Sequence, residues 1–453
     1  MTLTPVAAAP VADPPAADAP PADAPAVEAE PADIRLASPP SGLYVHVPFC
    51  VSICPYCDFV VYAGRAARGP ASQLERFVAA LEIELALRAD ALDARWGSVK
   101  GTSSPGTASP GTRRPLQTLY LGGGTPSLLP AATIARLVDL VRGRFGLADG
   151  AEVTLEANPG TDERGDPHAM RAAGVTRLSI GAQSFDPAEL RALGRRHRPE
   201  DVVETVRAAR DAGIGSVSLD LLYDVPGQSL DSWSRSLDAA LALEPDHVSL
   251  YALTLDDPDA EGITGPLGDH LPLRHGARAW RARTTPKQDE DRAAAMYELA
   301  DERLSAAGLA WYEISNWARA GHASRHNLGY WRGASWEAAG PGAHAFDGAT
   351  RRWNAARLDG YLAALLPGDG SPSAVPPGGA DAELDAGAAG PGEPAMLALR
   401  TRAGLPRTSV DDPELGETLR WAIDGGLLEE AGDRLVLSRR GRLLSNEVFA
   451  RLV

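Results

Sequence analysis

The fold of this chain is decided by one short stretch, residues 43–57, which reads LYVHVPFCVSICPYC. Its first five residues are rich in valine and aromatic side chains, which is typical of a strand. Cys50, Cys54 and Cys57 follow in a loop with the spacing C-x3-C-x2-C, and the other residues of the 453-residue chain include no cysteine. An odd number at so tight a spacing excludes a disulfide framework. Thiolates are soft ligands for zinc or iron–sulfur clusters, so the loop is a candidate metal site.

The number of cysteines narrows the kind of metal site. A structural zinc site needs four protein ligands, and an electron-transfer cluster normally uses four cysteines. A [4Fe–4S] cluster held by only three thiolates leaves one iron open to a ligand from outside the protein. Two alternatives remain open at this point: a zinc site completed by a histidine such as His46, and buried cysteines without a metal.

Strand and helix patterns alternate over most of the chain. β-Branched runs occur at residues 43–47, 117–121, 152–156, 177–180, 216–222, 247–253 and 310–314. Between them, amphipathic patterns predict helices at 74–88, 131–144, 201–212, 232–243 and 289–309. This order predicts an α/β fold with parallel strands and right-handed crossovers, and we expect an incomplete (β/α) barrel. A doubly wound sheet is the alternative.

Changes in composition suggest the domain limits. Residues 1–41 form an Ala/Pro-rich tail that cannot bury enough apolar area to fold, so we expect disorder. We place the barrel at 42–320 with a low-complexity insertion at 101–114, and read 256–285 as a loop. Residues 321–367 are expected to close the barrel, and 368–393 to form a flexible linker. Residues 394–453 predict helices and a short hairpin, a winged-helix-like module that packs against other protein parts.

Polar residues and glycines mark the ends of successive predicted strands. In a (β/α) barrel, functional residues lie at the carboxyl ends of the strands. The second strand runs into Gly122-Gly123-Gly124-Thr125, and the third ends at Glu156. Each feature alone is compatible with an ordinary turn or cap. Together they predict a binding site on the same rim as the cysteine loop, with contributions from further strands by Gln183, Asp220 and Ala252.

The cysteine loop resembles the C-x3-C-x-aromatic-C signature of the radical S-adenosylmethionine superfamily. Longer motifs are similar to oxygen-independent coproporphyrinogen III oxidases and their HemW-type haem-chaperone relatives: LYVHVPFC (43–50), LGGGTPS (121–127), LEANPG (155–160), SIGAQSF (179–185) and SLDLLYDVPGQ (218–228). The resemblance runs from about Leu43 to the C-terminus. It implies that Cys50, Cys54 and Cys57 hold a [4Fe–4S] cluster whose remaining iron chelates the amino and carboxylate groups of S-adenosylmethionine. Reduction of the cluster could then generate a 5′-deoxyadenosyl radical.

The resemblance also implies roles for individual residues in binding S-adenosylmethionine. Tyr44 and Tyr56 would lie close to it, with Tyr56 near the adenine, and Ala252 would line the adenine pocket. The methionine end would be bound by Gly123, Gly124 and Thr125. The ribose and carboxylate would be bound by Glu156, Gln183, Arg195 and Asp220, because carboxylates accept from hydroxyls and a guanidinium can clamp a carboxylate. A solvated basic turn is the alternative for Arg195.

Two departures distinguish the branches of this subgroup. The oxidases resemble C-x3-C-x2-C-x-C, whereas Phe59 occupies the position of their additional cysteine here. They also have an ordered N-terminal extension where this chain has its Ala/Pro tail. The stretch from His326 to Trp331 fits the HNxxYW motif of the haem-chaperone branch. His326 is therefore a candidate axial ligand of haem, and a structural hydrogen-bonding histidine is the alternative.

These features favour a haem chaperone that binds haem and delivers it to respiratory haem proteins. The cluster and S-adenosylmethionine would support transfer or formation of a homodimer. The alternative is an enzyme that converts coproporphyrinogen III to protoporphyrinogen IX by oxidative decarboxylation. Whether S-adenosylmethionine is cleaved productively is left open, and so is enzymatic activity.

Charge and hydropathy bear on partners and location. The chain has 44 basic and 60 acidic residues, a net charge of −16, which argues against broad binding to nucleic acid or to an anionic membrane. No apolar stretch reaches the roughly 18 residues of a membrane helix, and the N-terminus lacks a basic, apolar signal. We expect a cytoplasmic protein without stable membrane insertion.

Overall fold

The computed structural model describes residues 37–67, 69, 72–99, 112–255, 257, 259–260, 262–265, 268–366, 368, 378–381 and 390–453. The predictions for the tail 1–41, the insertion 101–114 and the linker 368–393 lie wholly or mostly outside these residues. Within the described part of the chain, no helix is long and apolar enough to cross a membrane.

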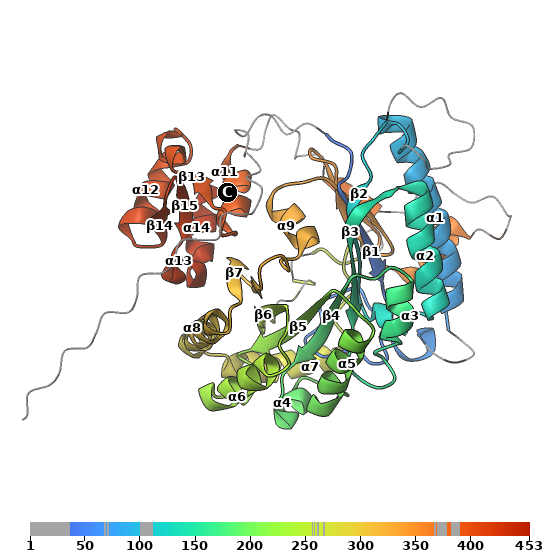
Figure 1. Cartoon of the computed structure of the whole chain (residues 1–453), viewed down its shortest axis with the longest axis horizontal. Helices are drawn as coiled ribbons and strands as arrows, with labels where there is room; N and C mark the ends of the chain where they lie inside the picture. Colours follow the sequence, from blue (N-terminus) through green and yellow to red (C-terminus); the bar gives the residue numbers. More distant parts are fainter. Residues whose placement is uncertain are drawn as a thin grey trace, which may run out of the picture. The chain divides into compact units, whose positions relative to one another are not determined.

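Six parallel strands form the centre of a twelve-stranded sheet (Figure 1). They pair in chain order: β1 (Gly42–Val47), β2 (Leu116–Gly123), β3 (Leu147–Ala157), β4 (Arg177–Gln183), β5 (Ser216–Tyr223) and β6 (His247–Ala252). Their apolar side chains, such as Leu43, Leu119 and Leu219, are almost completely buried. The predicted α/β fold with parallel strands is therefore confirmed.

Helices follow most of these strands and cover one face of the sheet (Figure 1). They are α1 (Leu74–Trp96), α2 (Ala131–Arg144), α3 (Pro167–Ala172), α4 (Pro187–Ala192), α5 (Pro199–Asp211), α6 (Leu230–Leu241) and α8 (Glu290–Ala306). In α1, Phe77, Leu81 and Leu85 point into the main core, as their spacing predicts. The side chains of Asp166, Asp186 and others accept hydrogen bonds from the first free amides of their helices.

The sheet is extended at both edges, and its two edge strands, β12 and β7, do not pair with each other. At one edge β8 (Asn316–Ala318) pairs antiparallel with β6, and β7 (Ala310–Glu313) lies beyond it, so the predicted seventh strand is not the next parallel strand. At the other edge β9 (Trp336–Ala339) pairs parallel with β1, followed by β10 (His344–Phe346), β11 (Arg351–Asn354) and β12 (Gly378–Asp381). Region 321–367, which also contains α9 (Arg325–Trp331) and α10 (Leu358–Leu365), thus adds β9, β10 and β11 to the sheet beside β1.

The segment predicted as a loop at 256–285 contains a helix, α7 (His275–Thr284), followed by a 3-10 turn at Thr285–Lys287. Two further 3-10 turns lie at Gly64–Ala66 and Pro126–Leu128. The sequence of α7, HGARAWRART, carries almost no apolar stripe, and its buried residues are Arg281 and Thr284. Such a helix is stabilised by tertiary contacts more than by its own pattern, so periodicity could not reveal it.

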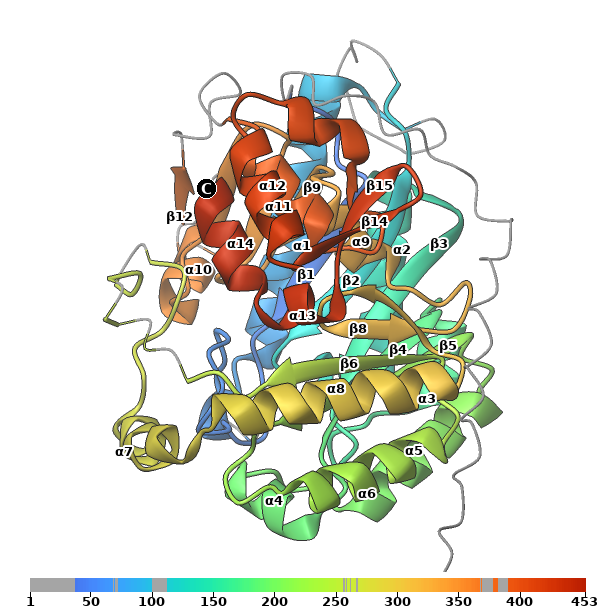
Figure 2. The ribbon, with the colours of Figure 1, turned by 90° about the vertical axis from the view of Figure 1, so that its left-hand side faces the viewer.

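The C-terminal residues form a small module with its own hydrophobic core, drawn in red in Figure 2. It contains α11 (Gly392–Leu399), β13 (Leu405–Pro406), a 3-10 turn (Arg407–Asp411), α12 (Gly416–Asp424), β14 (Leu428–Ala431), β15 (Arg434–Leu437), α13 (Arg439–Leu443) and α14 (Ser445–Leu452). The predicted hairpin is confirmed as β14 and β15, and β13 adds a third strand. A buried ion pair of Arg442 with Asp301 joins the module to the sheet domain, and so does a pair between the half-buried Arg400 and the buried Glu313.

Candidate functional site

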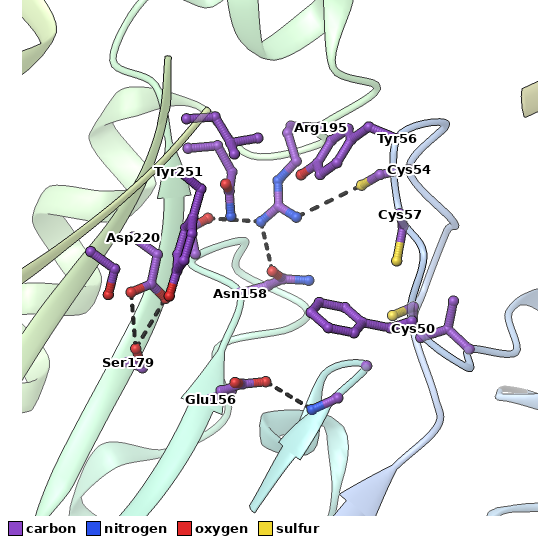
Figure 3. Close-up of a pocket in the computed structure, with 18 of the residues that line it drawn as sticks. Cys50, Cys54, Tyr56, Cys57, Glu156, Asn158, Ser179, Arg195, Asp220 and Tyr251 are labelled. Atoms are coloured by element: carbon purple, nitrogen blue, oxygen red, sulfur yellow. Dashed lines mark hydrogen bonds between the residues drawn. The ribbon is translucent and has the colours of Figure 1, made fainter. Parts of the chain in front are cut away.

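The cysteine loop leaves the carboxyl end of β1 and is closed at its base. The backbone of Phe49 forms a bridge with Tyr62, and the amide of Cys50 donates to the Tyr62 carbonyl at 3.0 Å. Cys50, Cys54 and Cys57 are half-buried and line a cavity of about 400 Å³. Figure 3 shows the three sulfur atoms on one side of this cavity, while Asp220 and Tyr251 lie on the opposite side. The structure therefore brings the predicted metal site and the predicted strand ends into one pocket.

Arg281 of α7 holds this loop from outside. Its Nη2 donates to the Tyr56 carbonyl at 3.1 Å, its Nε donates to the Pro55 carbonyl at 3.3 Å, and its guanidinium pairs with the Asp58 carboxylate. The arginine side chain is nearly buried. One residue thus fixes the backbone between the second and third cysteines. It could not be predicted from the sequence, because α7 itself was not predicted.

The residues of the loop fit a [4Fe–4S] cluster better than a single metal ion. Within the described residues, no group of three or more His, Cys, Asp or Glu side chains could hold one ion. His46 is not available to complete a zinc site, since its Nε2 contacts the Val60 carbonyl at 2.8 Å and its Nδ1 contacts the Tyr44 hydroxyl at 3.0 Å. In a cubane cluster each thiolate binds a different iron, so three separated sulfurs are what such a cluster needs.

Burial favours the protonated form of two of the three thiols, Cys50 and Cys57. Burial raises the pKa of Cys50 to about 11 and also raises the pKa of Cys57. The Thr125 hydroxyl donates to the Cys50 sulfur at 3.4 Å, which partly offsets the effect of burial on the Cys50 pKa. Assembly of a cluster on these residues must therefore release protons.

The glycine turn after β2 packs tightly against β1 and the cysteine loop. Gly123 has a φ of +107°, and a Cβ atom there would lie 2.4 Å from the His46 ring. The amides of Gly123, Gly124 and Thr125 donate to Glu156, Val47 and Phe49. Gly123 and Gly124 line the pocket, but their N–H groups are already used, so a ligand would meet these residues through carbonyl oxygens. The Thr125 side chain is buried and supports Cys50 instead of lining the pocket.

Glu156, at the end of β3, accepts two hydrogen bonds inside the pocket. The Tyr120 hydroxyl donates to its Oε1 and the Gly123 amide to its Oε2, both at 2.8 Å. Burial raises the pKa of Glu156 to about 7, although the two hydrogen bonds act in the opposite direction. The carboxyl group therefore changes charge near neutral pH.

Arg195 reaches the cysteine loop, so it is not the solvated turn residue that the sequence left open. Its Nη1 lies 3.8 Å from the Cys54 sulfur, and its Nη2 donates to Asn158 Oδ1 at 2.6 Å and to the Gly181 carbonyl at 2.8 Å (Figure 3). Its Nε is buried without a hydrogen-bond partner among the described residues. An unsatisfied buried donor beside the pocket suits an anionic ligand group. Gln183 also lines the pocket, and its φ of +64° lies in the left-handed region. Residues other than glycine rarely adopt this conformation, and those that do are often found at functional sites.

Asp220 of β5 is held by a chain of hydrogen bonds from the far end of the pocket. The Ser179 hydroxyl donates to both of its oxygens at 3.0 and 3.1 Å, and Ser218 donates at 3.4 Å. Ser218 contacts His247 Nδ1, and the Tyr312 hydroxyl contacts His247 Nε2, both at 2.8 Å. Burial raises the pKa of Asp220. The carboxylate is thus oriented before any ligand binds.

The remaining predicted residues occupy different positions. Tyr56 lines the pocket and packs against an apolar cluster that includes Leu253, and Ala252 lines the pocket at the end of β6. Tyr44 is set back, since its ring lies 6.0 Å from that of Tyr120, which lines the pocket itself. Tyr120 within β2, Asn158 directly after β3 and Ser179 near the start of β4 complete the site. Only Asn158 stands at the carboxyl end of a strand, which was the available signal for it.

His326 is buried in the first turn of α9, and both of its ring nitrogens are hydrogen-bonded. Nδ1 contacts the Thr118 hydroxyl at 2.8 Å, and Nε2 contacts the Tyr330 hydroxyl at 2.7 Å. Burial lowers its pKa to about 3, so the imidazole is neutral. In this conformation the residue serves a structural role, and binding to haem iron requires Nε2 to leave Tyr330. The next residue, Asn327, lines the pocket.

Comparisons with known proteins agree with the geometry. Residues 108–240 match the family model described as the radical SAM superfamily. The chain is 41% identical to a protein of Mycobacterium tuberculosis named "Heme chaperone HemW", over 91% of this chain and 95% of the relative. It is 30% identical to the protein of that name from Bacillus subtilis, over 90% and 97% of the two chains. Among solved structures, coproporphyrinogen III oxidase (HemN) from Escherichia coli superposes with a TM-score of 0.69 at 20% identity, over 92% of this chain and 91% of that one, which shows a shared fold.

Proposed function

Because this chain belongs to the HemW family of haem chaperones within the radical SAM superfamily, we propose that it binds haem and hands it on to respiratory haem proteins. The observation that carries this proposal is the similarity to the HemW protein of Mycobacterium tuberculosis along almost the whole of both chains. Phe59 supports it: the side chain is 65% exposed and lines the pocket where the oxidases have a further cysteine. Residues 50–57 would hold a [4Fe–4S] cluster in this function.

The pocket residues bind and orient the cofactors in this proposal. A cluster held by three thiolates supplies an open iron position that can take the amino and carboxylate groups of S-adenosylmethionine. Glu156 and Asp220 would accept hydrogen bonds from the ribose hydroxyls, because both carboxyl groups face the pocket and are oriented by neighbouring donors. Arg195 would direct its free Nε toward a ligand carboxylate. Tyr56 and Ala252 would form the apolar surface for the adenine.

The proposal includes His326 as the haem ligand. Its neutral imidazole can donate a lone pair to iron once Nε2 exchanges the Tyr330 hydroxyl for the metal. The ring of Tyr120, which lines the pocket, lies 5.1 Å from the His326 ring, so the ligand would approach from the pocket side. A cytoplasmic location and association into a homodimer during transfer also belong to this proposal.

The test uses the full chain reconstituted anaerobically with iron and sulfide. We expect haem titration to give a saturable change in the haem absorption band. Incubation with coproporphyrinogen III, S-adenosylmethionine and a reductant is expected to yield no protoporphyrinogen beyond the level of a Cys54→Ser control. Catalytic formation of protoporphyrinogen, or failure to bind haem, would contradict the proposal. Sedimentation with and without S-adenosylmethionine measures dimerisation.

A further inference from the structure

The pocket extends past the strand ends at which S-adenosylmethionine is expected to bind. Four alternate residues of β4 line it, namely Arg177, Ser179, Gly181 and Gln183. At about 3.3 Å per residue, the regular part of the strand from Arg177 to Gly181 alone spans roughly 13 Å. Gln183, at the carboxyl end, lies on the side of the cysteine loop, whereas Arg177 begins the strand. The pocket therefore continues to the amino end of the parallel strands, where no role has been assigned.

A buried cation stands at this deep end. The Arg177 side chain is 3% exposed, and only its Nη1 has hydrogen-bond partners among the described residues, the Ser216 hydroxyl at 3.1 Å and the His322 carbonyl at 2.9 Å. The Nε and Nη2 atoms of Arg177 have no hydrogen-bond partner among the described residues, and both retain some exposed surface. The guanidinium therefore presents two unused donor atoms to the pocket.

No carboxylate of the described residues forms an ion pair with Arg177. Burial raises the pKa of Asp220 and the charge of Arg177 offsets only part of this rise, while the Asp220 oxygens are bound by Ser179 and Ser218. A buried charge without a partner is costly, and the cost is removed when an anion binds. The deep end is thus an electropositive end of a pocket whose middle is lined by Glu156 and Asp220.

The second polar group at the deep end comes from the HNxxYW motif. Asn327 lines the pocket, and its side-chain amide has no hydrogen-bond partner among the described residues. Ser324, which caps α9 by accepting from the Asn327 amide, lines the same space. In the first turn of α9, Asn327 therefore lines the pocket, while the neighbouring His326 contacts Thr118 and Tyr330.

We infer that Arg177 and Asn327 form a carboxylate-binding subsite at the deep end of the pocket. A planar guanidinium with two free donors matches a carboxylate, and the Asn327 amide can donate a further hydrogen bond. Two ligands carry such a group: haem, through its propionates, and a second S-adenosylmethionine, through its methionine end. The assignment to a haem propionate rests on the proposed function and names the part of the cargo that the chain recognises.

The test compares haem with haem dimethyl ester, in which both propionates are neutral, on the anaerobically reconstituted chain. We expect the wild type to bind haem at least about tenfold more tightly than the ester, since hydrogen bonds to charged groups contribute this much. Arg177→Gln should bind the two compounds equally, and Arg177→Lys should keep part of the preference. Ser216→Ala removes one contact of Arg177 and leaves its charge, so it should keep the full preference. Melting temperature and cluster absorbance check that each variant is folded.

The outcomes distinguish a haem propionate from the carboxylate of a second S-adenosylmethionine. They also distinguish failure of the subsite from failure of the proposed function. A preference for haem that survives in Arg177→Gln, or a wild type without any preference, overturns the propionate assignment. If the wild type binds no haem, the proposed function fails, and S-adenosylmethionine decides about the subsite. Equilibrium dialysis would then have to find two molecules per wild-type chain and one per Arg177→Gln chain. An equal number bound by the two proteins would overturn the carboxylate subsite.

Discussion

Arg195 points its Nη1 at the sulfur atom of Cys54, 3.8 Å away, across the mouth of the pocket. The two residues are far apart in the sequence, and Asn158 fixes the same guanidinium through Nη2 at 2.6 Å. The cysteine loop is therefore tied electrostatically to the ends of β3 and β4. The guanidinium thus helps to fix the position of a sulfur atom that would bind iron.

Replacement of Cys54 by serine should abolish the iron–sulfur cluster and leave the fold largely intact. The side chain is half-buried at the pocket mouth and belongs to no hydrophobic core cluster of the described residues. We expect the reconstituted variant to lack the visible absorbance of the cluster while its circular dichroism matches that of the wild type. Ser52→Ala, which changes a neighbouring residue of the same pocket, is the matched control. A cluster that survives in Cys54→Ser would refute the ligand assignment.

Arg281 should determine how long the cluster remains bound. Arg281→Ala removes the contacts to the carbonyls of Pro55, Tyr56 and Cys57 and the ion pair with Asp58, four contacts to the loop that carries the cysteines. Hydrogen bonds from charged groups contribute about 1.5–3 kcal/mol, so we expect cluster loss to a chelator to accelerate by roughly tenfold or more. The measurement is the decay of cluster absorbance under argon.

Arg278→Ala is the control for that experiment, because Arg278 lies on the same helix, is 45% exposed and pairs with Asp257 away from the cysteine loop. It should lose its cluster at the wild-type rate. Equal rates for Arg281→Ala and the wild type would show that α7 does not hold the loop.

Binding of S-adenosylmethionine should strengthen as the pH rises through 7. The pKa of Glu156 is raised to about 7, so its carboxyl group is mostly neutral at pH 6 and mostly ionised at pH 8. The ionised form accepts from ribose hydroxyls and attracts the sulfonium. If only this form binds, the apparent Kd should fall about tenfold between pH 6 and pH 8. Equilibrium dialysis of the reconstituted protein measures it.

The groups around Glu156 keep this interpretation simple. Tyr44, Tyr120 and Tyr330 all have raised pKa values and remain neutral in this range, so the other acid facing Glu156 is Asp220. Glu156→Gln should bind with an affinity that no longer depends on pH, and a pH step that persists in this variant would assign it to another group. The pKa of Glu156 is about 4.5 in the unfolded chain and about 7 in the folded one. Without ligand, the free energy of unfolding should therefore decrease as the pH rises from about 4.5 to 7, because the folded protein holds this proton more tightly.

Substitutions of His326 and Tyr330 should have opposite effects on haem binding. His326→Ala should remove an axial ligand and change the spectrum of bound haem. Tyr330→Phe removes the hydroxyl that competes for Nε2, so it should tighten haem binding by about twofold to tenfold, the worth of one hydrogen bond. His344→Ala, an exposed histidine in β10, is the control and should behave like the wild type. An unchanged haem spectrum in His326→Ala would leave that residue with its structural role alone.

Much of the fold could be predicted because its central strands have strong local patterns. The strands from β1 to β6 are apolar runs followed by amphipathic helices, and neighbours in sequence are neighbours in the sheet. The edges could not be predicted in this way. β8 inserts between β6 and β7 through a turn of a few residues, and β9 reaches β1 from the other end of the domain. Such pairings depend on tertiary contacts that no short pattern encodes.

The residues of the site also fall into those with a local sequence signal and those whose role depends on tertiary contacts. Cys50 and Glu156 could be found because they lie after or at the end of a recognisable strand, and Asp220 because it is an acidic residue within one. Arg281 could not be found, because it lies on a helix without an apolar stripe, and its role exists only through contacts with a distant loop. The same holds for Arg177, which begins a strand where a buried arginine has no local signature.

The most direct test of the central claim is the rate at which haem passes from the loaded, reconstituted chain to a respiratory apo-cytochrome. A chaperone transfers its cargo within a complex, so we predict that the rate rises with the concentration of the acceptor and exceeds the rate of spontaneous haem release. The release rate is measured separately with apomyoglobin as a passive acceptor. Transfer to the cytochrome that is no faster than release, at every acceptor concentration, would contradict the claim that this chain hands haem on.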